Sequence, residues 1–399
     1  MRFLFAIYAL LALTVFLSWL NYRLLARLFI FWRGRKVRSV YLLLTSAAVL
    51  VMVFGWPHRP WSADPAQEYL IFLLYGALVW LAGQLVLITL QPLFYVVDRW
   101  GGRRMMKTEA GPGGPGMTRR AFLRGALATV PLAAFVPGAQ GIYSAQAELA
   151  VVRHELKIPG LPAGLDGFRI GQVSDTHVGQ YFGMARLDEV CARLRDEKPD
   201  LVAVTGDFVD DLGQIGPAVE RLSALNKSVP HGVYFCWGNH EYFRDPRLIE
   251  ATLRTGGIKI LKDEAAEIVP GERPLFLLGV DYPPGESARR SMNIPAERRR
   301  ECLAAANRGV PADAVRVLIA HHPDFLIDGF AANVPLTLAG HSHGGQVVIG
   351  GKPLVSLHTY VRGLYRQDGM WGYVSSGAGH WFPFRLGCPP EISVFTLRA

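Results

Sequence analysis

Cysteine and charge are both scarce in this chain, and their scarcity excludes several classes of protein. Only four cysteines occur in 399 residues, none in a Cys-x-x-Cys pair: Cys191, Cys236, Cys302 and Cys388. This excludes a small disulfide scaffold and leaves zinc-ribbon and thioredoxin-like sites without support. Three pairings are open to four cysteines, and we expect buried free thiols. Half of the residues are apolar and 19% are charged, which excludes a disordered or collagen-like chain.

Acidic residues are rare in the N-terminal part, so the net charge of +9 belongs there. Residues 1–150 contain 15 Lys and Arg against 5 Asp and Glu, whereas residues 151–399 contain 27 against 28. The C-terminal part therefore lacks the basic stripe that neutralises a nucleic-acid backbone, and we expect no nucleic-acid partner. Of the eleven histidines, only His58 precedes residue 150. The chain divides into a basic, apolar part and a neutral, histidine-rich part.

Three apolar runs precede residue 100, and each is near the roughly 20 residues that a helix needs to cross a bilayer. They cover 3–20, 40–56 and 69–90. Buried helices of a soluble core are the alternative, but such helices carry a polar stripe that these runs lack. Basic residues crowd between the first two runs and again after the third, whereas 57–68 contains one arginine. The positive-inside rule therefore predicts cytoplasmic basic stretches, with the N-terminus and the loop around His58 outside.

A Gly- and Pro-rich break at 111–116 precedes a segment typical of a twin-arginine export signal. The sequence Thr-Arg-Arg-Ala-Phe-Leu-Arg at 118–124 is followed by a weakly apolar stretch at 125–136 and by a small-residue pattern ending at Ala147. A fourth membrane helix with basic flanks is the alternative. Both interpretations send residues 150–399 to the outer face of a bacterial cytoplasmic membrane. The first also implies the twin-arginine export machinery as a partner, and cleavage after Ala147 stays open.

Five apolar, strand-like runs between residues 165 and 345 end in side chains that bind metal ions. The motifs at their ends are Asp175-Thr176-His177, Gly206-Asp207-Phe208-Val209-Asp210, Gly238-Asn239-His240-Glu241, His321-His322 and Gly340-His341-Ser342-His343. Continuous apolar runs suit strands that are covered on both faces, and ligands gather where such strands end. Segments with helical spacing separate the runs at 184–197, 217–225 and 245–255. The sequence therefore predicts a layered α/β domain with a site at the strand ends.

The ligand types indicate divalent cations. Carboxylates, imidazoles and one amide oxygen suit manganese, iron or zinc better than copper or calcium. The two imidazoles of His-x-His can serve one ion each, and a carboxylate such as Asp207 can bridge both ions and leave room for a shared hydroxide. Two ions about 3.5 to 4 Å apart stabilise both oxygens of a displacement at phosphorus. A single His or Gly-Asp at a strand end is usually structural, but five in series are hard to explain as turns.

This series of motifs resembles the calcineurin-like metallophosphoesterase superfamily over most of residues 165–345. The resemblance implies a four-layer αββα sandwich and a binuclear metal centre that hydrolyses phosphodiester, phosphomonoester or pyrophosphate bonds by in-line attack of the shared hydroxide. It also implies that Asp207 bridges the two ions and that His240 faces the phosphate. The other implied ligands are Asp175, His177 and His343 for one ion, and Asn239, His321 and His341 for the other.

Two neighbours of these residues are candidates for orienting imidazole rings, namely Asp210 and Glu241. His321 is preferred to His322 as the ligand because it directly follows the strand. The C-terminal stretch, with Pro390-Glu391-Ile392, resembles a bacterial membrane-associated branch of the superfamily. That branch is similar to UDP-diacylglucosamine hydrolases and to exported phosphoesterases with twin-arginine signals.

The leading hypothesis is a hydrolase of phosphate esters on the outer face of the cytoplasmic membrane, where anchoring favours a lipid-linked or envelope-attached substrate. One alternative is a UDP-diacylglucosamine-type pyrophosphatase of lipid A synthesis, although nucleotide-linked precursors are cytoplasmic. The second is a non-catalytic membrane scaffold that retains the fold, although such a protein should have lost ligands.

Three segments are expected along the chain: a three-span helical region at 1–100, a basic linker with the signal or a fourth span at 101–149, and the metallophosphoesterase domain at 150–399. A run of arginines at 298–300 falls in a predicted helix at 295–307. We interpret that run as a solvated helix face rather than a phosphate clamp.

Overall fold

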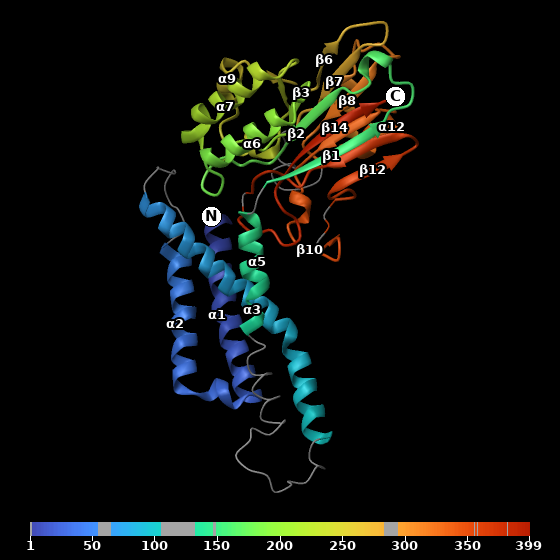
Figure 1. The fold of residues 1–399 in the computed structure, drawn as a ribbon. Coiled ribbons are helices and arrows are strands. Elements are labelled where there is room, and N and C mark those ends of the chain that lie inside the picture. The colour runs from blue at the N-terminus through green and yellow to red at the C-terminus, as the bar shows by residue number, and fades with distance from the viewer. Residues whose placement is uncertain are drawn as a thin grey trace. The chain divides into compact units, whose positions relative to one another are not determined.

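The computed structural model describes residues 2–54, 65–104, 132–146, 149–282, 294–354, 356, 358–380 and 382–399. The chain forms two compact units, Met1–Ile142 and Tyr143–Ala399, and each is described by itself (Figure 1). The twin-arginine sequence at 118–124, the predicted cleavage position at Ala147 and the loop around His58 lie outside the described residues.

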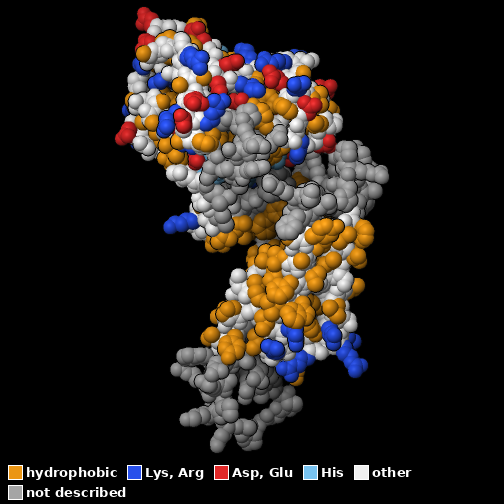
Figure 2. Space-filling model, turned by 180° about the vertical axis from the view of Figure 1, so that it is seen from behind, with side chains coloured by type: hydrophobic (Ala, Val, Ile, Leu, Met, Phe, Trp, Pro, Cys, Tyr) orange, Lys and Arg blue, Asp and Glu red, His pale blue; other side chains and the backbone are white. Residues whose placement is uncertain are grey.

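Long apolar helices form the N-terminal unit: α1 (Arg2–Leu28), α2 (Arg35–Phe54) and α3 (Pro65–Arg104), with a 3-10 turn, η1 (Ile30–Arg33), between the first two. The stretches that are long and apolar enough to cross a membrane are Tyr8–Leu28, Arg35–Phe54 and Leu73–Leu93. The three predicted apolar runs are therefore helical. Hydrophobic side chains dominate the visible face of this unit, and Lys and Arg gather at one end (Figure 2).

Several polar residues of these helices meet inside the bundle. Asn21 Nδ2 donates a hydrogen bond to Gln84 Oε1 at 3.0 Å, and the Tyr41 hydroxyl donates to the same oxygen at 2.8 Å. Trp80 Nε1 donates to Ser18 Oγ at 3.2 Å. Asn21, Gln84 and Ser18 are all buried. Because hydrocarbon offers a polar group no partner, these bonds hold α1, α2 and α3 together.

A further helix, α5 (Val136–Ala145), runs antiparallel to α3. Phe135 packs directly on Gly83, because a Cβ on Gly83 would lie 2.0 Å from the Phe135 ring. Gly138 packs on Val79, since a Cβ on Gly138 would lie 3.1 Å from the Val79 carbonyl oxygen. Phe135 thus contacts Gly83, and Gly138, which follows Phe135 in the chain, contacts Val79, which precedes Gly83. The helix α5 therefore runs in the opposite direction to α3. Small residues at such contacts allow helices to approach closely.

We expect Gln84→Leu to destabilise the helical unit by about 1 kcal/mol, because it removes two side-chain hydrogen bonds worth roughly 0.6 kcal/mol each in a membrane. Thr89→Ala is the matched control, since the Thr89 hydroxyl is exposed and bonds only within its own helix, to the Val86 carbonyl. Unfolding by dodecyl sulfate in mixed micelles measures both variants. Equal stability of the two would contradict the polar network.

Two six-stranded sheets face each other in the C-terminal unit. The first has the order β1-β14-β2-β3-β4-β5, formed by β1 (Ala150–Lys157), β14 (Glu391–Arg398), β2 (Arg169–Val173), β3 (Leu201–Val204), β4 (Val233–Phe235) and β5 (Lys259–Ile260). The second has the order β12-β13-β9-β8-β7-β6, formed by β12 (Gly363–Gln367), β13 (Met370–Val374), β9 (Leu336–Ala339), β8 (Val315–Ile319), β7 (Leu275–Gly279) and β6 (Glu264–Val269). Both sheets are mixed, and β2, β3 and β4 are parallel neighbours, as are β7, β8 and β9.

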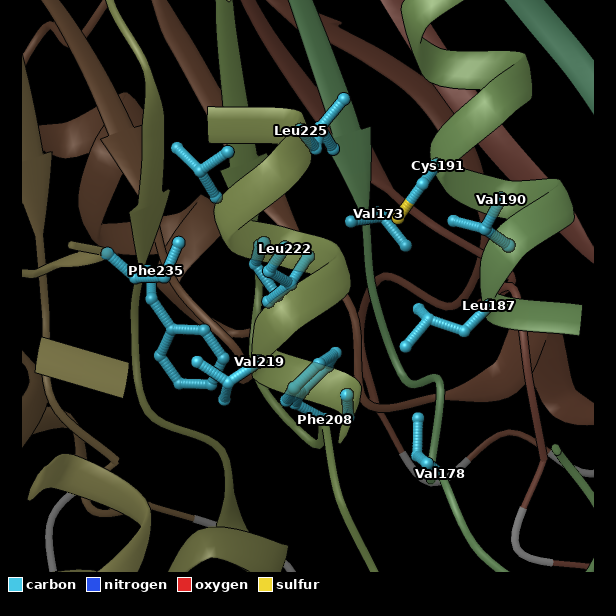
Figure 3. Close-up of a cluster of buried hydrophobic side chains, with 14 of the residues drawn as sticks. Val173, Val178, Leu187, Val190, Cys191, Phe208, Val219, Leu222, Leu225 and Phe235 are labelled. Carbon is cyan, nitrogen blue, oxygen red and sulfur yellow. The ribbon is translucent and has the colours of Figure 1, made fainter. Parts of the chain in front are cut away.

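Helices cover the outer face of each sheet. The first sheet carries α6 (Met184–Asp196), α7 (Ile215–Ser228) and α9 (Pro246–Thr255); the second carries α11 (Ala296–Ala306) and α12 (Phe325–Ala331). Figure 3 shows Leu187 and Val190 of α6 and Leu222 of α7 among the core side chains next to Val173 and Phe235. A second apolar layer, which includes Ile170, Leu201, Leu277 and Leu338, lies between the sheets. The predicted αββα sandwich is therefore confirmed.

Local sequence explains why these elements form where they do. All four residues of β3 are buried, because the strand has a helix layer on one face and the other sheet on the other. The Asp245 side chain accepts hydrogen bonds from the backbone N–H groups of Arg247 and Leu248, and Pro246 occupies the first turn of α9. The predicted free thiols are also confirmed, since all four cysteines are buried and unpaired.

The arginine run at 298–300 is solvated only in part. Arg299 is buried, and its Nε donates to Asp328 Oδ2 at 2.6 Å while its Nη1 donates to the Ile294 carbonyl at 2.7 Å. The prediction of a fully solvated face is wrong at this position, because the α11 side chain reaches α12 and joins the two helices.

Candidate metal centre

The carboxyl ends of five strands meet at one edge of the sandwich. The side chains that follow them are Asp175 and His177 after β2, Asp207 and Asp210 after β3, Asn239 and His240 at the start of α8 (Asn239–Phe243) after β4, His321 after β8, and His341 and His343 after β9. The sheets are joined here by Gln172 Nε2, which donates to the Ala339 carbonyl at 2.9 Å. Gly340 permits the close approach, since a Cβ there would lie 1.9 Å from Ser174 Oγ.

The predicted ligands form two clusters. In the first, His177 Nε2 and His343 Nε2 are 3.1 Å apart, and Asp175 Oδ1 lies 3.6 Å from His343 Nε2. In the second, His321 Nε2 lies 3.1 Å from both Asn239 Oδ1 and His341 Nδ1. Nitrogen and oxygen atoms with lone pairs thus converge at two neighbouring points.

Asp207 connects the two clusters. Its Oδ2 lies 3.2 Å from His321 Nε2 and 3.7 Å from His177 Nε2. Its Oδ1 accepts a hydrogen bond from the backbone N–H of His240 at 2.9 Å. One carboxylate oxygen therefore faces an imidazole of each cluster, while the other is held by the backbone.

Burial and charge set the protonation of these groups. Burial raises the pKa of the Asp207 carboxyl, but the imidazoles of His321 and His240 outweigh it and hold that pKa well below its ordinary value. Burial lowers the pKa of His321, yet Asp207 raises it to about 10. For His341 and His343, burial lowers the pKa well below the usual range, and neighbouring imidazoles lower it further. These shifts favour an ionised Asp207 beside a protonated His321, together with neutral His341 and His343.

The backbone of the site is strained. Ten non-glycine residues in the described part of the chain have positive φ, and five of them are predicted ligands with φ between 48° and 70°: Asp175, His177, Asp207, His341 and His343. This left-handed conformation costs about 1–2 kcal/mol for a residue with a Cβ. Such strain concentrates at functional sites, where the surrounding structure holds the residues in place.

Glu241 holds the loops after β3 and β4 together. Its buried carboxylate accepts backbone hydrogen bonds from Asp207 at 2.9 Å, Phe208 at 2.8 Å and Gly238 at 2.8 Å. The prediction that Glu241 orients an imidazole ring is therefore wrong: its partners are backbone N–H groups. They belong to the two loops that carry Asp207 and Asn239, so Glu241 sets the backbone of the site.

Other groups orient the imidazoles. Asp210 fulfils its predicted role: Oδ1 lies 2.6 Å from His240 Nδ1, and Oδ2 lies 3.3 Å from His177 Nδ1. His321 Nδ1 lies 2.7 Å from the Thr205 carbonyl oxygen, to which it donates, and this contact orients the ring so that Nε2 faces Asp207. In His240 and His321, the ring nitrogen that is turned away from the cluster centre therefore has a hydrogen-bond partner.

His322 lies outside the two clusters, whereas His321 belongs to the second. With His341 and His358, His322 forms a further group of imidazoles whose ring nitrogens lie within 4.8 Å of one another. The sequence reasoning missed Arg385, a buried arginine whose Nη2 lies 3.4 Å from His343 Nδ1 and donates to the Gly377 carbonyl at 3.2 Å. No local motif marks it, because it lies 42 positions after its partner.

Comparison with known proteins agrees with this geometry. Residues 168–345 match the model of the calcineurin-like phosphoesterase family. The domain therefore belongs to that family, as the resemblance implied, and the protein is a metallophosphoesterase, a hydrolase of phosphoesters that depends on metal ions.

Similar proteins occur in bacteria and animals. The metallophosphoesterase YkuE of Bacillus subtilis is 29% identical over 71% of this chain and 98% of its own length. Phosphodiesterase YaeI of Escherichia coli is 26% identical over 70% of this chain and 99% of its own. A zebrafish (Danio rerio) transmembrane protein with a metallophosphoesterase domain is 27% identical over 65% of this chain, but the match spans only 59% of that protein.

We expect Gly238→Ala to disrupt the site, because the new Cβ would lie 2.2 Å from Asp207 Oδ1 and 2.7 Å from its backbone nitrogen. Displacing that carboxylate should weaken metal binding by about 10- to 100-fold. Equilibrium dialysis with manganese measures the change.

Gly216→Ala is the matched control, since a Cβ there meets nothing within 4 Å and the position is helical. It should leave metal binding unchanged and raise stability by about 0.5–1 kcal/mol. Equal metal affinity in both variants would contradict the role assigned to the Gly238–Asp207 contact.

Proposed function

We propose that the site binds two divalent cations that share Asp207. Asp175, His177 and His343 hold the first ion; Asn239, His321 and His341 hold the second. The position of Asp207 Oδ2, 3.2 Å from an imidazole of one cluster and 3.7 Å from an imidazole of the other, is the observation that carries the proposal.

The donor set fits such ions. His177 Nε2 and His343 Nε2 lie 3.1 Å apart and face Asp175, and a cation between these atoms would use all three lone pairs. Imidazole, carboxylate and amide donors suit manganese, iron or zinc. Two ions at such a site stabilise both the entering and the leaving oxygen of an in-line displacement at phosphorus.

His240 serves the substrate in this proposal. Its side chain is 17% exposed, whereas those of His177 and His321 are fully buried. Its Nε2 lies 3.9 Å from Asp207 Oδ2, and its Nδ1 is held by Asp210. A phosphate bound beside Asp207 would thus meet an imidazole that offsets its charge or gives a proton to the leaving oxygen.

We place the catalytic domain on the outer face of a bacterial cytoplasmic membrane. Arg99, Arg103 and Arg104 at the C-terminal end of α3 favour a cytoplasmic location for that end of the helix. Since α5 runs antiparallel to α3, it leads the chain back toward the opposite face before β1 begins. An outer location favours a lipid-linked or envelope-attached phosphoester over a nucleotide-linked precursor of lipid A. The same topology fits a fourth span or an uncleaved twin-arginine signal.

A catalytic role is favoured over a scaffold by the completeness of the site. A protein that kept only the fold would have no need of a strained backbone at Asp207 and at four of the residues around it. The strained backbone conformation places the side chains of the predicted ligands around the two clusters.

We expect Asp207→Asn to abolish turnover of bis(4-nitrophenyl) phosphate in the presence of manganese, with a loss of at least about 100-fold. Removing the shared charge should also lower the manganese bound per chain, measured by elemental analysis. Asp188→Asn is the matched control, because Asp188 is a half-exposed acid on α6 whose ion pair with Arg221 lies at the surface. Undiminished turnover in Asp207→Asn would overturn the two-ion assignment.

The topology has its own test. We expect an epitope tag added after Ala399 to be removed when protease is added to intact spheroplasts, because the domain lies outside. A protease site inserted after Gly34, between α1 and α2, is the internal control and should be cut only after lysis. Protection of the C-terminal tag in intact spheroplasts would place the domain in the cytoplasm.

A further inference from the structure

The stretch that follows β9 leaves the domain as a hairpin and returns to the metal centre. Its base is closed by the Ser342 hydroxyl, which donates to the Val361 carbonyl. The outgoing arm carries His343 of the first cluster. The returning arm carries His358, whose ring centroid lies 5.3 Å from that of His341. Both arms of this excursion, of which the structure describes residues 342–354, 356 and 358–361, therefore reach the metal centre.

The tip of the excursion is the hairpin of β10 (Val348–Ile349) and β11 (Lys352–Pro353). Ile349 pairs with Lys352, and Leu354 N–H donates to the Val347 carbonyl at 2.7 Å, which continues the antiparallel ladder. Residues opposite each other or two apart share a face, so Ile349, Lys352 and Leu354 point the same way. Val348 points the other way and is 8% exposed, whereas Ile349 is 62% and Leu354 65% exposed.

This outward face, formed by Ile349, Lys352 and Leu354, combines two large apolar side chains with one cation. No acidic residue occurs between positions 329 and 367, so nothing in this stretch repels an anionic surface. An apolar face with a lysine beside it is typical of segments that lie at a membrane interface. The same chain carries three helices apolar and long enough to span a membrane. Only four residues separate the end of α5 at Ala145 from the start of β1 at Ala150.

We propose that the outward face of the β10–β11 hairpin inserts into the lipid surface, and that the metal centre acts on phosphoesters anchored in that surface by an acyl chain. The proposal rests on the phosphoester hydrolysis proposed above. Ile349 and Leu354 enter the acyl region, and Lys352 binds the anionic headgroups. Because both arms of the excursion reach the ligand histidines, insertion holds the site next to the lipid phosphates.

Two substrates with the same leaving group test this proposal: methyl 4-nitrophenyl phosphate, which is soluble, and the 4-nitrophenyl ester of dioleoyl phosphatidic acid. The full chain is reconstituted in nanodiscs of phosphatidylglycerol and phosphatidylcholine. We expect Ile349→Glu combined with Leu354→Glu to lower kcat/KM at least tenfold for the lipid ester and less than twofold for the soluble ester. Leu248→Glu on α9, where the leucine is 43% exposed, is the control and should affect neither.

The outcomes separate the two proposals. An equal loss on both esters, or no loss on either, would overturn the lipid proposal and leave the hydrolysis intact. A wild-type protein that cleaves neither ester would overturn the proposed hydrolysis itself.

Charge reversal gives a second readout. Lys352→Glu should slow cleavage of the lipid ester in phosphatidylglycerol nanodiscs and leave it unchanged in pure phosphatidylcholine. An identical rate in both lipids would contradict the headgroup contact.

Discussion

The catalytic domain is built around the buried carboxylate of Asp207. Asp207 is 2% exposed, and a buried charge is tolerated only when opposite charge and hydrogen bonds surround it. The imidazoles of His177, His240 and His321, which follow β2, β4 and β8, face it, and the backbone N–H of His240 holds its other oxygen. These partners come from both sheets, so the αββα arrangement and the charge balance of the site depend on each other. The strained backbone of the ligands is held by this network.

The residues that surround the predicted ligands have different structural roles. Glu241 binds backbone N–H groups and joins two loops, and Asp210 contacts imidazole nitrogens. Gly238 allows the loops after the neighbouring strands β3 and β4 to approach closely, and Gly340 does the same for loops of the two facing sheets. Arg385 adds a buried cation beside His343. A ligand set alone therefore does not define the centre, because its geometry depends on residues that bind no ion.

In the helical N-terminal unit, too, buried polar groups are paired with one another. Its polar residues are few, and Ser18, Asn21, Tyr41, Trp80 and Gln84 form hydrogen bonds with one another where α1, α2 and α3 meet. In hydrocarbon, an amide or hydroxyl group cannot form hydrogen bonds with solvent, so each such group needs a hydrogen-bond partner within the protein. Close contacts at Gly83 and Gly138 then give α5 its direction. In the proposed arrangement, the direction of α5 and the apolar face of the β10–β11 hairpin both associate the enzyme with a lipid surface.

The sequence alone determined the two-part organisation, the membrane-length helices, the strands and the residues at their ends, because hydropathy, periodicity and motif order are local properties. It also identified every residue of the two clusters. It did not reveal that Glu241 binds backbone rather than imidazole, that Arg299 is buried, or that Arg385 reaches His343. Nor did it reveal which face of the β10–β11 hairpin is exposed. These depend on contacts between segments distant in the chain, and only the packing of the two sheets and their helices brings such segments together.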